Sequence, residues 1–156
     1  MLKPILLVDD NPYDQELALV ALTYAGLLNE TITVSDGEEA LDYLFRRGVY
    51  ATRPPGNPAV VLLDLKMPKV DGVEVLKAVR SCPDTARIPV VMLTGSKEEA
   101  DIARSYASGV NAFVVKPMDF KELVRAVSEV GAFWAVLNEP PVGSKRYPAT
   151  KPRASD

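Results

Sequence analysis

The chain has 156 residues, of which 47% are hydrophobic and 25% charged, and its 18 basic and 21 acidic side chains leave a formal net charge of −3. This length suits one domain with a sizeable core, and the small negative charge gives no support for nucleic-acid binding. The sequence has no histidine and one cysteine, Cys82, which excludes an internal disulfide, a histidine-ligated zinc site and a phosphohistidine on this chain. No apolar run approaches the roughly 20 residues of a membrane helix, and residues 1–4 show no signal-peptide pattern. We therefore expect a cytoplasmic protein that contacts neither membrane nor nucleic acid.

The first predicted element is a buried strand at residues 5–8, which ends at Asp9 and Asp10. Asn11 is a good N-cap and Pro12 suits the first helical position, so a helix is predicted to follow. The apolar residues that recur there at helical spacing are Leu17, Val20, Ala21 and Tyr24.

Strands and helices continue to alternate along the chain. Further strands are predicted at 31–34, 60–63, 88–93 and 112–115, and further helices at 36–47, 73–81, 96–108 and from 119 onward. Residues 60–63 form an unbroken apolar run, typical of a strand covered on both faces in a parallel sheet. Residues 96–99, Ser-Lys-Glu-Glu, have the form of a capping box. Five strand–helix pairs predict an α/β fold with a doubly wound parallel sheet.

The composition changes after residue 137. Residues 138–156 contain four prolines and show no apolar periodicity. We therefore predict one domain over residues 1–137 and a proline-rich tail over residues 138–156. The tail is too short to form an output domain or an enzyme, so neither is expected.

Polar side chains stand where the predicted strands end: Asp9, Asp10, Asp64, Thr94 and Lys116. Because the carboxyl ends of neighbouring parallel strands line one edge of a sheet, we expect these residues to lie close together at that edge. The carboxylates suit Mg²⁺, and the hydroxyl and ammonium suit the oxygens of a phosphoryl group. Taken singly, each residue also fits an ordinary role at a turn, a helix cap or the protein surface.

In these segments the sequence resembles the receiver domains of two-component response regulators. The resemblance covers residues 5 to 134, and its motifs lie at 7–11, 63–68, 71–72, 93–96 and 115–117. It implies a flavodoxin-like sheet of five parallel strands in the order 2-1-3-4-5. It also implies a signalling protein that catalyses only its own phosphoryl transfer and autodephosphorylation.

The resemblance assigns the metal and acceptor residues. Asp64 would be the phosphoacceptor, since a carboxylate can attack phosphorus and hold an acyl phosphate. Asp9, Asp10, Asp64 and the backbone carbonyl of Lys66 would hold Mg²⁺ or Mn²⁺.

The resemblance also assigns residues that contact or sense the phosphoryl group. Thr94 would donate its hydroxyl to a phosphoryl oxygen, and Lys116 would pair with the group. The bond from Lys116 to Pro117 would be cis. Phe113 would be either an aromatic switch residue or a plain core aromatic. Lys66 and the two residues after Thr94 would tune the phosphoryl lifetime.

Within the family the chain is similar to single-domain regulators that partner bacterial phytochrome kinases. The features that carry this are Asn11-Pro12, the loop at residues 48–51 and Phe133-Trp134. A histidine kinase would then be the phosphodonor, and an alternative role for the receiver is that of a phosphate sink or a phosphatase substrate for a kinase. A phosphatase of the haloacid-dehalogenase type is a less favoured alternative. It would need an Asp-x-Asp motif after the first strand and a cap domain, and the sequence shows neither. A flavin carrier would need a phosphate-cradling loop where this chain has acidic residues.

The last helix carries more apolar residues than one core contact needs. Its expected inward stripe is Phe120, Leu123, Val124, Val127 and Trp134, and a second stripe is Ala126, Val130, Phe133 and Leu137. A second apolar stripe favours an interface. We therefore expect a two-fold homodimer through the helix at 96–108, the strand at 112–115 and the last helix, in which the tail can reach across the partner. The alternative is that the proline-rich tail folds back over the second stripe within one chain.

Overall fold

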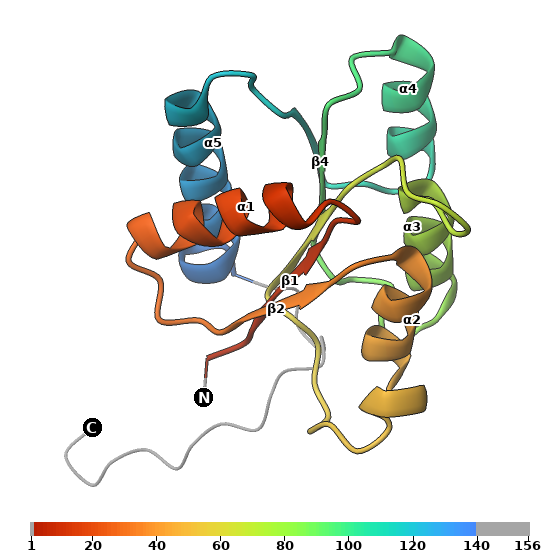
Figure 1. The fold of residues 1–156 in the computed structure, drawn as a ribbon. Helices are drawn as coiled ribbons and strands as arrows, with labels where there is room; N and C mark the ends of the chain where they lie inside the picture. Colours follow the sequence, from red (N-terminus) through yellow and green to blue (C-terminus); the bar gives the residue numbers. More distant parts are fainter. Residues whose placement is uncertain (1, 140–156) are drawn as a thin grey trace, which may run out of the picture.

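The computed structural model describes residues 2–139, and they form one parallel sheet flanked by helices (Figure 1). The strands are β1 (Ile5–Val8), β2 (Thr31–Val34), β3 (Val60–Leu63), β4 (Val90–Thr94) and β5 (Ala112–Val115). All neighbouring strands are parallel, and their order is β2-β1-β3-β4-β5. This confirms the predicted flavodoxin-like arrangement. The predicted boundary between domain and tail remains untested, and residues 140–156 lie outside the described part.

The helices are α1 (Pro12–Tyr24), α2 (Gly37–Phe45), α3 (Gly72–Ser81), α4 (Glu99–Ala107) and α5 (Phe120–Ala132), with a 3₁₀ turn η1 (Gly48–Tyr50) and a π-helical segment η2 (Phe133–Leu137). Helices α1 and α5 cover one side of the sheet, and α2, α3 and α4 lie on the other (Figure 1). None of the helices in residues 2–139 is long and apolar enough to cross a membrane.

The central strands have cores on both faces. Along β3, Val61 and Leu63 join the core cluster under α2 and α3, whereas Val60 and Leu62 join the cluster under α1 and α5. This alternation follows from the two-residue period of a strand, and it explains the unbroken apolar run in the sequence.

Side-chain caps start four of the five helices. Asn11, Asp36, Asp71 and Asp119 each accept hydrogen bonds from backbone amides in the first turn of the following helix. Helix α4 differs, so the predicted capping box is wrong. The helix begins at Glu99, and the hydroxyl of Ser96 donates instead to Asp101 at 2.6 Å. A hydrogen bond to an ionised carboxylate is stronger than a neutral cap, which accounts for the difference.

Helix α1 buries two alanines and one leucine and exposes other large apolar residues. Its buried residues are Ala18, Ala21 and Leu22. Of the residues at helical spacing in the sequence, Tyr24 is 78% exposed and Val20 is 40% exposed. The helix therefore presents an apolar face to solvent.

The predicted stripes on the last helix need correction. Leu123, Val124, Val127 and Trp134 face the core, but Phe120 is exposed. Val130, expected on the second stripe, also packs against the core, since it lies seven residues, two helical turns, after Leu123. Phe133 is exposed, and the side chain of Leu137 lies outside what the structure describes.

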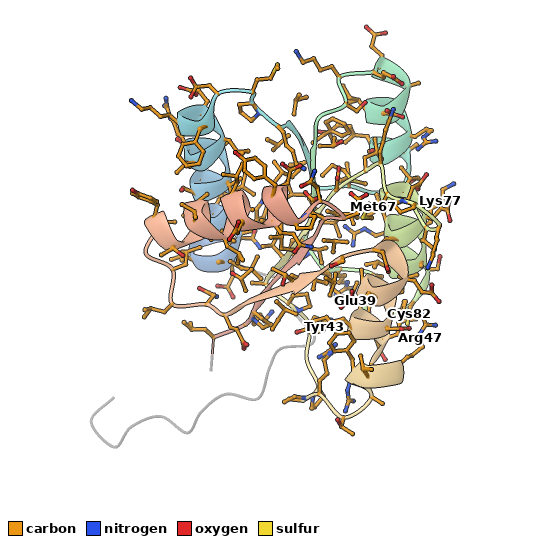
Figure 2. The ribbon with its side chains drawn as sticks, viewed as in Figure 1. Glu39, Tyr43, Arg47, Met67, Lys77 and Cys82 are labelled. Carbon is orange, nitrogen blue, oxygen red and sulfur yellow. The ribbon has the colours of Figure 1, made fainter. Side chains whose placement is uncertain are left out.

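The long loop after α2 is fixed by an arginine. The guanidinium of Arg53 lies 4.3 Å from the ring centroid of Tyr43 and donates to the Tyr43 carbonyl. Tyr43 also makes an edge-to-face contact with Tyr50, whose hydroxyl donates to Glu39 at 2.8 Å. Glu39 and Tyr43 both project from α2 (Figure 2). These contacts order a proline-rich loop far from the carboxyl edge of the sheet.

Candidate functional site

Three carboxylates meet at the edge of the sheet where β1 and β3 end. Asp9 and Asp10 directly follow β1, and Asp64 directly follows β3, its neighbour in the sheet. The register pairs Val8 with Leu63, so Asp9 and Asp64 stand side by side one residue later. One oxygen of each carboxylate lies within 4.8 Å of the other two. Such a group of oxygens suits a hard divalent cation.

The ammonium of Lys116, which follows β5, reaches this carboxylate group. Its Nζ lies 2.7 Å from Asp9, 3.2 Å from Asp14 and 3.8 Å from Asp64. The backbone amide of Lys116 donates to the Thr94 carbonyl at 2.7 Å and so continues the pairing of β4 with β5. Burial alone would lower the pKa of Lys116, but the hydrogen bond to Asp9 and the surrounding negative charges outweigh burial and raise that pKa.

The Asp64 carboxylate has an unusual environment for an acidic side chain. Only 13% of the side chain is exposed, and burial raises its pKa from 3.8 to about 6. The positive charge of Lys116 and a hydrogen bond from the Thr94 hydroxyl oppose this rise, whereas the negative charge of Asp9 adds to it. A bound divalent cation would favour the ionised carboxylate, the form that can attack phosphorus.

Two other expected site residues lie beside this centre. Lys66 follows Asp64 by two positions, and its exposed ammonium pairs with Glu98 at 3.7 Å and with Asp101 at 3.6 Å. The role of its backbone carbonyl as a metal ligand stays a prediction. Phe113 on β5 is partly buried and packs against the core cluster under α3. That contact is what a core aromatic makes, and a switching role stays a prediction.

The bond between Lys116 and Pro117 is trans, as is every other peptide bond in residues 2–139. The expected cis bond is therefore wrong for this state. The trans form of an X-Pro bond is favoured by about 0.5–1 kcal/mol, and the Lys116 ammonium already reaches Asp9 with it.

Sequence reasoning missed two residues that build the site from α1. Asp14, in the first turn, is a third carboxylate near Lys116, after Asp9 and Asp64. Gln15 donates from Nε2 to the Asp9 carbonyl at 2.5 Å and to the Val34 carbonyl at 3.3 Å, so it holds the turn after β1 against β2. The sequence does indicate these two residues by their position. The cap of the helix directly follows Asp10, so the first turn of the helix lies at the same edge of the sheet as the three carboxylates.

The residue after the cap of α3 is Gly72, and the surrounding backbone leaves no room there for a side chain. Its amide donates to the Leu65 carbonyl at 2.8 Å. A Cβ at this position would collide with the Asp64 carbonyl oxygen and lie 2.9 Å from the Leu65 Cα. The loop that carries the acceptor candidate therefore requires the absence of a side chain here.

A second polar cluster joins this loop to α4. The Asp101 carboxylate accepts the Ser96 hydroxyl at 2.6 Å and lies 3.6 Å from Lys66 and 4.0 Å from Arg104. Arg104 also lies 3.8 Å from Asp71. The Ser96 hydrogen bond, followed by the nearby positive charges, lowers the pKa of Asp101 against the effect of burial. In the sequence alone, nothing distinguishes the buried Asp101 from an aspartate exposed on the surface of a helix.

The comparisons with known protein families, sequences and structures all point to the same family. The model of the response regulator receiver domain matches residues 5–128. Response regulator Rcp1 of Synechocystis is 39% identical over 132 residues, which cover 85% of this chain and 88% of Rcp1. Its Mn²⁺-bound crystal structure superimposes with a TM-score of 0.82 and covers 90% of this chain and 99% of that one.

Two further solved structures are similar. The phosphorylated cyanobacterial phytochrome response regulator RcpA is 40% identical, with a TM-score of 0.84 and coverage of 90% of this chain and 99% of that one. The bacteriophytochrome response regulator RtBRR is 61% identical, with a TM-score of 0.74 and coverage of 92% of this chain and 87% of that one.

Proposed function

Since the chain belongs to the response regulator receiver domain family, we propose that Asp64 accepts a phosphoryl group from a sensor histidine kinase. The observation that carries this proposal is the meeting of Asp64 with Asp9, Asp10, Lys116 and the Thr94 hydroxyl at one edge of the sheet. The phosphorylated state of the similar protein RcpA supports it.

The charges at the site fit a divalent cation. The Lys116 ammonium lies within 4 Å of the carboxylates of Asp9, Asp14 and Asp64. The Asp10 carboxylate adds a further negative charge beside those of Asp9 and Asp64. Asp9, Asp10 and Asp64, with the expected backbone carbonyl of Lys66, would hold Mg²⁺ or Mn²⁺, and the Mn²⁺-bound form of Rcp1 supports this choice. When bound, the cation supplies positive charge to the oxygens of the transferred phosphoryl group.

The protein's own residues carry out the phosphoryl transfer and respond to it. A carboxylate oxygen of Asp64 attacks phosphorus in line, forming a P–O bond as the P–N bond to the kinase imidazole breaks. The Lys116 ammonium moves from Asp9 toward the phosphoryl oxygens and offsets their charge. The Thr94 hydroxyl moves from the Asp64 carboxylate to a phosphoryl oxygen, and the surface of α4, β5 and α5 repacks as a population shift.

The kinase needs a surface beside Asp64, and the exposed apolar face of α1 offers one. The helix starts two residues after Asp10, and Tyr13, Val20 and Tyr24 project from it into solvent. We infer that a helix of the kinase packs on this face while its phosphohistidine reaches Asp64. The similarity to Rcp1, RcpA and RtBRR favours a cytoplasmic bacteriophytochrome as that kinase.

Label transfer tests this function directly. Candidate bacteriophytochrome kinases are phosphorylated with labelled ATP and mixed with the wild-type protein and with Asp64→Asn. We expect rapid transfer to the wild type and none to the variant, because an amide is a poor nucleophile. Undiminished labelling of the variant would exclude Asp64 as the acceptor.

We also propose a two-fold homodimer through α4, β5 and α5. Strand β5 is a partly buried edge of the sheet. Exposed apolar side chains follow it at Met118 and Phe120, and others lie on η2, after α5, at Phe133 and Val136. An isologous contact would cover this surface and the strand edge together. Light scattering on the intact chain and on a chain ending at Asn138 tests the dimer. A monomer at high micromolar concentration in both would refute it, and a dimer of the intact chain alone would place the tail in the interface.

A further inference from the structure

Asp101 is a buried carboxylate that the proposed phosphoryl transfer does not use. It lies in the first turn of α4 and is 8% exposed. A buried carboxylate is costly unless strong hydrogen bonds compensate it. The Ser96 hydroxyl supplies one, donating to Asp101 Oδ2 at 2.6 Å. Asp101 therefore fixes the loop that follows Thr94.

Ser96 connects this carboxylate to the phosphoacceptor candidate. Its backbone amide donates to the Thr94 Oγ1 at 3.3 Å. The Thr94 hydroxyl lies beside the Asp64 carboxylate, and the hydrogen bond from Ser96 holds the hydroxyl oxygen in this position. Hydrogen bonds thus connect Asp101 through Ser96 to Thr94, from α4 to the residue beside the acceptor candidate.

We propose that Asp101 is a positioning residue which, through Ser96, holds the Thr94 hydroxyl in its place beside unphosphorylated Asp64. It thereby restrains the movement of Thr94 to a phosphoryl group. This inference rests on the proposed function of Asp64. Removing the restraint shifts the population toward the arrangement that receives the phosphoryl group, and phosphorylation becomes faster.

The hydrogen bond, and not the charge of Asp101 on its basic neighbours, is the contact that matters. Lys66 and Arg104 lie 3.6 Å and 4.0 Å from the carboxylate, and both side chains are exposed. Each cation is exposed and lies beyond hydrogen-bond distance of the carboxylate, so its pairing contributes less than the short bond to Ser96. The short bond to Ser96 is partly shielded from water and belongs to the stronger, charge-assisted class.

The test is the rate of Asp64 labelling by acetyl phosphate in the presence of Mg²⁺. Asp101→Ala and Ser96→Ala should each label faster than wild type, by about three- to tenfold, the size usual for side chains in one network. The double variant should label no faster than either single variant, because both changes break the same connection from Asp101 to Thr94. Asp101→Asn keeps an oxygen that accepts the Ser96 hydroxyl, and it should bring the rate back toward wild type.

Glu98→Gln is the matched control. It removes one negative charge near Lys66, next to the same helix, and its side chain makes no capping hydrogen bond. It should label within about twofold of wild type, because exposed ion pairs are weak. Thermal melting shows that each variant is folded at the assay temperature.

The outcomes separate this inference from the proposed function. If wild type labels and both alanine variants label at its rate or more slowly, Asp101 does not restrain Thr94. Multiplying effects in the double variant, or failure of Asp101→Asn to rescue, would also overturn the inference. Absence of labelling in wild type would overturn the function of Asp64 and this role of Asp101 with it.

Discussion

The Lys116 ammonium lies 2.7 Å from Asp9 but 3.8 Å from Asp64, so it is held on the carboxylate that is not the acceptor. A phosphoryl group on Asp64 would bring new negative oxygens within its reach. Lys116→Met should therefore slow labelling by acetyl phosphate about 100-fold, the usual effect of removing one group that stabilises transition-state charge. Stabilisation of the variant by Mg²⁺ should persist, because the three carboxylates remain. Lys121→Met, at an exposed lysine in the first turn of α5, is the control, and equal rates for both variants would contradict the role of Lys116.

The raised pKa of Asp64 predicts a pH-dependent gain in stability on its removal. Without metal, folding disfavours the ionised carboxylate, so this residue costs no stability below pH 3.8 and an increasing amount as the pH rises through about 6. A rise from 3.8 to about 6 corresponds to on the order of 3 kcal/mol above that range. Asp64→Asn should therefore be more stable than wild type in EDTA at pH 7.5, and this advantage should vanish near pH 4. Urea unfolding at both pH values measures it, and a constant difference would contradict burial as the cause.

The sheet could be predicted from the sequence because its signals are local and strong. Apolar runs such as residues 60–63 leave few alternatives, and their polar ends mark one edge. The faces of the outer helices were harder. In α1 two of the three buried residues are alanines, Ala18 and Ala21, so the spacing of its large apolar residues does not reveal the buried face. Val130 was misplaced because two apolar stripes on one helix can share the core.

The candidate site was predicted as a set of strand ends, and its remaining parts depend on contacts between elements. Asp14 and Gln15 matter because β5 and β2 come close to the start of α1. Ser96 fits two roles in sequence, a helix cap or a partner of Asp101, and only the distance between them decides. Long-range side-chain contacts of this kind leave no periodic signal in a single sequence.

Metal binding should show as stabilisation. Asp9, Asp10 and Asp64 repel one another when no cation is bound, so Asp10→Ala should melt at a higher temperature than wild type in EDTA. Mg²⁺ at 100 times its dissociation constant should stabilise wild type by about 2.7 kcal/mol, and Asp10→Ala should lose most of this gain. Melting curves with Mg²⁺ and with EDTA measure both effects. An unchanged melting temperature of wild type at millimolar Mg²⁺ would count against the site.

The exposed face of α1 predicts a variant that separates kinase contact from chemistry. Val20 lies on this face, so Val20→Glu places a charge where the kinase would make an apolar contact. Glutamate forms helix at least as well as valine, so the fold should tolerate the change. Transfer of label from a phosphorylated bacteriophytochrome should slow at least about tenfold, a loss of about 1.4 kcal/mol in binding. Labelling by acetyl phosphate, which needs no docking surface, should stay at the wild-type rate.

Val49→Glu is the matched control for this experiment. Val49 is 86% exposed on η1, which follows α2 on the other side of the sheet, so it receives the same change away from α1 (Figure 1). Its transfer rate from the kinase should equal that of wild type. If the two glutamate variants receive label at the same rate, the kinase does not use α1. If Val20→Glu slows acetyl phosphate as much as the kinase, the substitution has damaged the carboxylate site itself, and the docking interpretation fails.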